Sequence, residues 1–257
     1  MTVAEKKEIV VNVLKESIRK KFQKYSPETN NMPFHYRLLG KDRMALFSFI
    51  QSLNTTFGTS IYEPVAIALA EGRFKKSVAQ YKPSNLISTE AQRQIQLILH
   101  DLIQAKRIPN KMQEIEDIRK VCQKGGFNKV KLTKVDICLE DMNNRLFMID
   151  MKTVKPNIGD FQKYKQTFME WMAVELARDP DIDINTIIGI PYNPQEPEPY
   201  QRWTMRGIFD ISKEVLVAEE LWDFIGGNGT YQILLDSFEA AGIELREEID
   251  NYFSRFK

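Results

Sequence analysis

The chain has 257 residues, enough for one large core or for one core with an elaborated lobe. Apolar residues make up 43% of it, and no stretch reaches the roughly 18 uninterrupted apolar residues of a membrane span, which predicts a cytoplasmic protein without a membrane partner. The N-terminus has mixed charge and no apolar segment, which excludes a secretory signal. Two cysteines (Cys122, Cys138) and two histidines (His35, His100) speak against a disulfide framework, a zinc site and a histidine-based nuclease centre.

The net charge of +1 conceals an uneven distribution along the chain. Residues 104–135 contain nine Lys and Arg against three acids, whereas residues 210–257 contain eleven acids against four bases. A basic middle with an acidic tail is typical of a protein with one surface that faces phosphates. Surface helices that simply carry charge produce the same pattern, so both interpretations stay open.

The first half of the chain has helical periodicity. Apolar residues recur at helical spacing over 5–24, 44–53 and 65–72, and Pro64 predicts a kink or a helix start. Ser88 is placed as the N-cap of a further helix, which has one apolar stripe. That stripe consists of Ala91, Ile95, Ile98 and Leu102.

The periodicity changes after Gly125-Gly126. Near-alternation over 130–140 predicts a strand, residues 141–144 form a turn, and residues 145–154 form a second strand, which together make an antiparallel hairpin. A helix is then expected from near Asp160, with one aromatic face. The wholly apolar run 187–190 is typical of a buried strand parallel to a neighbour.

This order of elements predicts an α/β fold, with a mixed central sheet flanked by helices. We expect a single domain over 1–257, with a mainly helical part at 1–125, a catalytic core at 126–195 and a C-terminal extension at 196–257. Prolines interrupt the chain after residue 190. The glycines at 226–229 lack the spacing and the lysine of a P-loop, and they indicate a tight turn before a helix.

The hairpin carries the residues that point to chemistry. Asp150 and Lys152 lie on one face of the second strand, because side chains alternate along a strand, and Met151 points away. Asp136 lies on the first strand near the same end of the hairpin. Two carboxylates beside one ammonium are costly to bury unless they pair or bind a cation.

Hard oxygen ligands favour Mg²⁺, so we predict a magnesium site formed by Asp136, Asp150 and the carbonyl of Met151. In this site Lys152 would orient the nucleophile and stabilise the developing charge. The alternative is a plain ion pair between Asp150 and Lys152, since the spacing Asp-x-Lys is short and common.

Asp136 with Asp150-Met151-Lys152 resembles the motif of the PD-(D/E)XK nucleases, although Val135 stands where the motif has proline. Beyond the motif, the chain is similar to type II restriction endonucleases of the TdeIII/MjaII type in several stretches. These stretches are Phe57–Glu63, Phe147–Lys155, Ile190–Pro194, Trp203–Gly207 and Trp222–Tyr231.

The resemblance implies a restriction-endonuclease-like fold and Mg²⁺-dependent cleavage of double-stranded DNA. A homodimer on a short palindromic site, paired with a cognate DNA methyltransferase, is expected. Related enzymes are associated with GGNCC, which is a lead for this chain. Many nucleases of this class add a glutamate from an N-terminal helix to the catalytic metal site; the candidate is Glu63, with an exposed helix glutamate as the alternative.

Four basic residues are candidates for DNA contacts. Arg202 and Arg206 follow the proline-rich loop, and arginine pairs well with guanine in the major groove. Lys155 follows the catalytic strand, and Lys165 lies on the helix after it; both are predicted to contact phosphates. A structure-specific nuclease with the same active site, and a non-catalytic DNA-binding protein of the same fold, remain alternatives to the restriction enzyme.

Overall fold

The computed structural model describes residues 1–152, 160–201 and 205–256. The chain divides into two compact units, one formed by residues 1–69 with 227–257 and the other by residues 70–226. Within the described part of the chain, no helix has both the length and the apolar character needed to cross a membrane.

The first unit is helical. Its elements are α1 (Val3–Lys24), α2 (Pro33–Leu39), α3 (Lys41–Phe57), the π-helical turn η1 (Gly58–Tyr62), α4 (Glu63–Ala70) and α10 (Thr230–Ser254). The helices predicted over 5–24, 44–53 and 65–72 are confirmed as α1, α3 and α4. Pro64 is the second residue of α4 and directly follows the π-helical turn, so the predicted helix start lies one residue before the proline.

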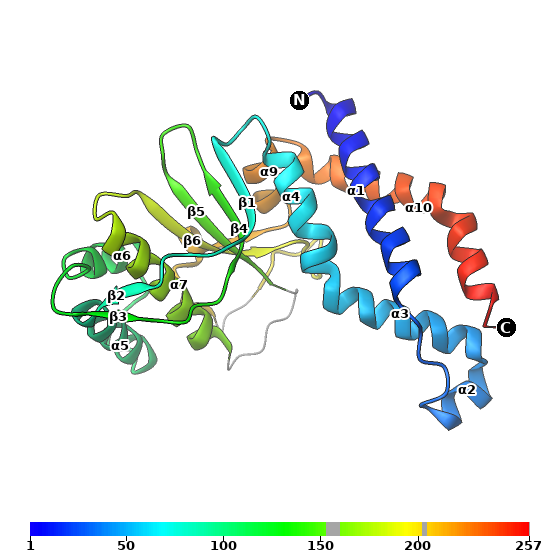
Figure 1. Cartoon of the computed structure of the whole chain (residues 1–257), viewed down its shortest axis with the longest axis horizontal. Helices are drawn as coiled ribbons and strands as arrows, with labels where there is room; N and C mark the ends of the chain where they lie inside the picture. The colour runs from blue at the N-terminus through cyan, green and yellow to red at the C-terminus, as the bar shows by residue number, and fades with distance from the viewer. Residues whose placement is uncertain (153–159, 202–204, 257) are drawn as a thin grey trace. The chain divides into compact units, whose positions relative to one another are not determined.

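Helices α1 and α10 run parallel, side by side (Figure 1). Two ion pairs join these helices, and the second lies one turn after the first on both of them. Lys15 pairs with Glu244, and Arg19 pairs with Glu248 at 2.6 Å. Helix α3 also packs against α1, because the ring of Phe49 on α3 stacks on the ring of Phe22 on α1, with centroids 5.3 Å apart.

The second unit contains a five-stranded sheet in the order β1-β4-β5-β6-β7. Strands β1, β4, β5 and β6 are labelled in Figure 1. Its strands are β1 (Lys76–Tyr81), β4 (Val135–Glu140), β5 (Leu146–Met151), β6 (Ile184–Ile190) and β7 (Val215–Val217). Strand β4 pairs antiparallel with both β1 and β5, whereas β6 pairs parallel with both β5 and β7. This mixed sheet with helices is the α/β fold predicted from the sequence.

Among the described residues, this unit also has a two-stranded ribbon and several helices. They are β2 (Leu86–Ser88), β3 (Phe127–Lys129), α5 (Thr89–Ile103), α6 (Lys111–Arg119), α7 (Asp160–Arg178), α8 (Ile211–Glu214) and α9 (Glu219–Gly226). Ser88 caps α5 as predicted, because its Oγ accepts from the N–H of Ala91 at 3.1 Å. Strands β1 and β2 lie inside the region expected to be mainly helical.

The predicted hairpin is confirmed, but its first strand is shorter than expected. β4 begins at Val135, because polar groups of the preceding residues bond elsewhere. The N–H of Val130 donates to the carbonyl of Asn85, and the carbonyl of Thr133 accepts from the indole of Trp171. At the turn, Asp141 Oδ1 accepts from the N–H groups of Asn143 and Arg145, which closes the hairpin.

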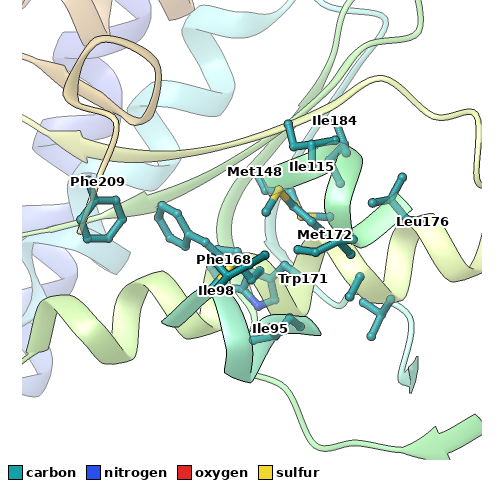
Figure 2. Close-up of a cluster of buried hydrophobic side chains, with 14 of the residues drawn as sticks. Ile95, Ile98, Ile115, Met148, Phe168, Trp171, Met172, Leu176, Ile184 and Phe209 are labelled. Atoms are coloured by element: carbon teal, nitrogen blue, oxygen red, sulfur yellow. The ribbon is translucent and has the colours of Figure 1, made fainter. Parts of the chain in front are cut away.

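The core lies between the sheet and helices α5, α6 and α7 (Figure 2). Helices α5 and α6 contribute Ile95, Ile98 and Ile115 to this core, and α7 contributes Phe168, Trp171 and Met172. They pack against the sheet face that bears Met148. The opposite face packs against α9, where the rings of Phe147 and Phe224 meet edge to face at 5.0 Å. Even-numbered residues of β5 therefore face α7, and this sets the side on which the site is built.

Candidate active site

The strand register brings Asp136 and Asp150 together. Ile137 pairs with Ile149 across the β4–β5 hairpin, so Asp136 is next to Asp150 at the end away from the turn. Asp136 Oδ2 accepts a hydrogen bond from the N–H of Met151 at 2.8 Å, which ties one strand to the other at this point. The predicted convergence of these carboxylates is therefore present in the fold.

Lys152 completes the group of three. Its Nζ lies 2.7 Å from Asp150 Oδ2, and its side chain is 22% exposed. The backbone N–H of Lys152 donates to the carbonyl of Gly189 at 2.9 Å, which keeps it against β6. Met151 points to the other face as predicted: a side chain on Gly189 would come within 2.8 Å of its sulfur.

Burial dominates the electrostatics of Asp150, which is only 8% exposed. Desolvation raises its pKa to about 7, with the neighbouring Asp136 also raising it and Lys152 lowering it. The ammonium of Lys152 thus does not offset the effect of burial on Asp150. Asp136 and Asp150 would be the residues that hold a divalent cation here, and its charge would favour the ionised form of Asp150.

Gln80 is a member of this site that the sequence did not indicate. Its Nε2 lies 3.4 Å from Asp136 Oδ1, so donors approach both oxygens of that carboxylate. Gln80 also has a φ of 53°, a left-handed conformation that is uncommon for a residue with a side chain. Strand β1 and strand β4 are far apart in sequence, and nothing local in the sequence predicts their pairing.

Two comparisons with known proteins decide the family. The model of the type II restriction endonuclease HinfI matches residues 3–242. The chain is also 30% identical to the type II restriction enzyme MjaII of Methanocaldococcus jannaschii, over 95% of this chain and 73% of that enzyme. The chain belongs to the HinfI family of type II restriction endonucleases.

More distant relatives extend this family membership. The type II restriction enzyme HgiCII of Herpetosiphon aurantiacus is 21% identical over 84% of this chain and 80% of its own length. HgiEI of the same organism is 21% identical over a similar extent. The resemblance stated from short sequence stretches is thereby confirmed at the level of the family.

The donor set fits a magnesium ion of the kind used in nucleases. Within the described residues, no three or more His, Cys, Asp and Glu side chains gather as a metal site, so the carboxylates available here are Asp136 and Asp150. Mg²⁺ commonly binds through one or two carboxylates and keeps several waters. Burial and the neighbouring Asp136 raise the pKa of Asp150 despite the ammonium of Lys152, and a bound cation would favour the charged carboxylate.

Glu63, the predicted fourth metal ligand, lies in the helical unit and is 3% exposed. The alternative interpretation of Glu63 as an exposed helix residue is therefore wrong. It begins α4 directly after the π-helical turn, and such turns occur often at functional sites. Its part in the metal site stays a prediction.

The DNA-contact predictions have different outcomes. Lys155 and Arg202 lie outside the described residues. Arg206 is exposed in the turn before α8, where contact with DNA stays a prediction. Lys165 is fully buried, with Nζ 2.6 Å from a carboxylate oxygen of both Glu114 and Glu214. The prediction that Lys165 contacts phosphates is wrong, because its ammonium is enclosed between these two carboxylates.

Lys165 belongs to a buried ion cluster, which we define as Lys111, Glu114, Lys165 and Glu214. Lys111 Nζ lies 3.0 Å from Glu214 Oε1 and also donates to Thr186 on β6. Burial lowers the pKa of Lys111 and raises that of Glu114. Burial works to raise the pKa of Glu214 as well, but the two ammonium groups outweigh it and the pKa is lowered.

This cluster also limits the interpretation of the basic middle of the chain. Six of its nine basic residues are exposed: Lys106, Lys120, Lys124, Lys129, Lys131 and Lys134. Lys111 is buried, while Arg107 and Arg119 are half-buried and pair with Asp117 and Glu116. A surface that faces phosphates would therefore have to be formed by the exposed lysines.

Proposed function

We propose that this protein is a type II site-specific deoxyribonuclease of the PD-(D/E)XK class that cleaves double-stranded DNA with Mg²⁺. The observation that carries the proposal is the convergence of Asp136, Asp150 and Lys152 at one end of the hairpin, in a chain of a restriction endonuclease family. The relatives are named as type II restriction enzymes, which supports action on a specific DNA site.

Each residue has a chemical role in this proposal. Asp136 and Asp150 would hold the metal, with the Met151 carbonyl and Glu63 as further candidate ligands. A bound Mg²⁺ would activate a water and offset charge on the scissile phosphate. The ammonium of Lys152, which lies against Asp150, would orient the attacking water and stabilise the charge that develops on the phosphate.

The target is proposed to be a short palindrome, for which GGNCC is the first sequence to test. A palindrome presents the same half-site twice, and a homodimer matches this symmetry. A methyltransferase that protects the same site in the host completes the proposed restriction-modification system. The protein's proposed location is the cytoplasm, where the DNA is.

The test is cleavage of plasmid and phage DNA by the purified protein with Mg²⁺ or with EDTA. Discrete fragments are expected only with Mg²⁺, and Asp150→Asn and Lys152→Ala should each lower the rate by roughly a hundredfold or more. The matched control is Asp183→Asn, because Asp183 forms an exposed ion pair with Arg145 at the turn end of the same hairpin. This variant should cut like the wild type.

Two results would contradict the proposal. Absence of Mg²⁺-dependent cutting on several DNAs of known sequence, methylated and unmethylated, would remove the nuclease assignment. Cleavage of branched DNA without cleavage of linear duplexes would instead establish a structure-specific nuclease with the same active site.

A further inference from the structure

Lys152 is covered by an aromatic ring that the nuclease motif does not contain. Its Nζ lies 4.4 Å from the centroid of the Tyr164 ring, on the first turns of α7. The same Nζ lies 2.7 Å from Asp150 Oδ2. The ammonium therefore contacts a carboxylate and the face of a ring at the same time. Attraction between a cation and the electron-rich face of an aromatic ring favours this arrangement.

The ring itself is held by buried neighbours. Phe161, one turn earlier on α7 and 1% exposed, meets the Tyr164 ring edge to face at 6.3 Å. Phe161 in turn packs edge to face against Phe209, also at 6.3 Å. The position of the Tyr164 ring is thus fixed by packing on its own helix and on the segment before α8.

The residue next to Tyr164 anchors the helix. Lys165 lies in the buried ion cluster, where Glu114 of α6 and Glu214 of α8 each approach its Nζ to 2.6 Å. Rotation or sliding of α7 would separate these buried charges, which is costly. Lys165 therefore fixes the position of α7, and the adjacent Tyr164 places its ring over Lys152.

We infer that Tyr164 is a positioning residue for the proposed nuclease reaction, whose ring face holds the Lys152 ammonium in place when Asp150 binds the metal. The inference rests on the proposed function. A metal on the Asp150 carboxylate competes with its ion pair to Lys152, and a free lysine side chain has many rotamers. The ring supplies a second contact that the metal leaves intact. Burial raises the pKa of the Tyr164 hydroxyl, so the ring remains neutral under assay conditions.

The experiment compares Tyr164→Phe with Tyr164→Leu in steady-state cleavage of a plasmid with Mg²⁺. The phenylalanine variant keeps the ring face and should retain kcat within about twofold. The leucine variant should lose kcat by roughly tenfold or more, with little change in KM or in the melting temperature. The matched control is Tyr36→Leu on α2, which removes a ring lying 5.7 Å from Lys41 in the helical unit.

A second measurement separates positioning from a general effect on the fold. When Lys152 is already replaced by methionine, Tyr164→Leu should cause no further loss of the residual activity, because its effect acts through the ammonium. If the leucine variant does not fold, Tyr164→Met, which keeps an apolar side chain of similar length, takes its place in both measurements.

Several outcomes would overturn the inference. Wild-type kcat in the leucine variant would show that the ring is dispensable, and an equal loss in the phenylalanine variant would assign the effect to the hydroxyl. An undiminished effect of Tyr164→Leu in the Lys152→Met background would mean that the ring acts elsewhere. If the wild-type protein itself does not cut DNA, the proposed function fails, and the inference fails with it.

Discussion

The sheet unit contains two groups of lysines and carboxylates that differ in balance and in access. The buried ion cluster has two of each, and all four side chains are at most 1% exposed. The group at the hairpin end has two aspartates and one lysine, and the Lys152 side chain is 22% exposed. The charges of the buried ion cluster balance, and almost no solvent reaches them. The group at the hairpin end has one more carboxylate than ammonium, and its lysine is accessible to solvent.

This difference separates a structural cluster from a site for chemistry. A balanced and enclosed set of charges fixes the helices that carry it, since opening it would leave unpaired charges in the core. An unbalanced set with net negative charge and an accessible edge attracts a cation. Burial, and after it the charge of Asp136, raises the pKa of Asp150 to about 7 although Lys152 lowers it.

The largest expected effect on stability comes from the closed cluster. Replacing Lys165 by methionine leaves Glu114 and Glu214 with only Lys111, so the free energy of unfolding should fall by about 3–5 kcal/mol. Urea unfolding followed by circular dichroism measures this. Lys163→Met is the control, because Lys163 is exposed on the same helix; it should change stability by less than about 0.5 kcal/mol.

Replacing Glu114 together with Lys165 restores the charge balance, since Lys111 and Glu214 then remain as a pair. The double variant should recover part of the lost stability. A Lys165→Met variant as stable as the wild type would show that the cluster does not hold the helices in place.

The next effect concerns Asp150 without metal. Its pKa is raised in the folded state, so the folded protein is favoured while the carboxyl keeps its proton, and stability is lost as pH rises through about 7. In EDTA, Asp150→Asn should therefore stabilise the protein at pH 8, by an amount on the order of a few kcal/mol, and much less at pH 5. Thermal unfolding at the two pH values measures the difference.

Mg²⁺ provides the internal control for this prediction. The metal should raise the melting temperature of the wild type at pH 8, because it binds the ionised carboxylates of the folded state. It should have little effect on Asp150→Asn. Equal stabilisation of both proteins by Mg²⁺ would mean that the ion binds elsewhere.

The smallest effect is expected at Gln80. Its amide supports Asp136 from the neighbouring strand, so Gln80→Ala should raise the Mg²⁺ concentration for half-maximal cleavage by about tenfold. Gln80→Gly should weaken cleavage equally, yet it should stabilise the fold relative to alanine, because glycine adopts a φ of 53° without strain. Normal Mg²⁺ dependence in both variants would remove Gln80 from the site.

Local sequence determined the hairpin, the helix after it and the buried parallel strand. Alternation of side chains along a strand is a local property, and it is sufficient to place Asp150 and Lys152 on one face. The short turn at 141–144 then fixed which residues of the two strands are neighbours, and so brought Asp136 to Asp150. The convergence of the three proposed catalytic residues was predictable because they lie within 136–152.

Tertiary structure alone decided which lysine is buried and which residues support the site. Lys165 looks like any solvated helix lysine in the sequence, but two carboxylates from α6 and α8 surround it in the fold. Gln80 reaches Asp136 only because β1 pairs with β4 across more than fifty residues of intervening chain. Periodicity in the sequence shows which face of a helix or strand is apolar. Contacts between distant elements depend on how those faces pack against one another, which no local sequence pattern specifies.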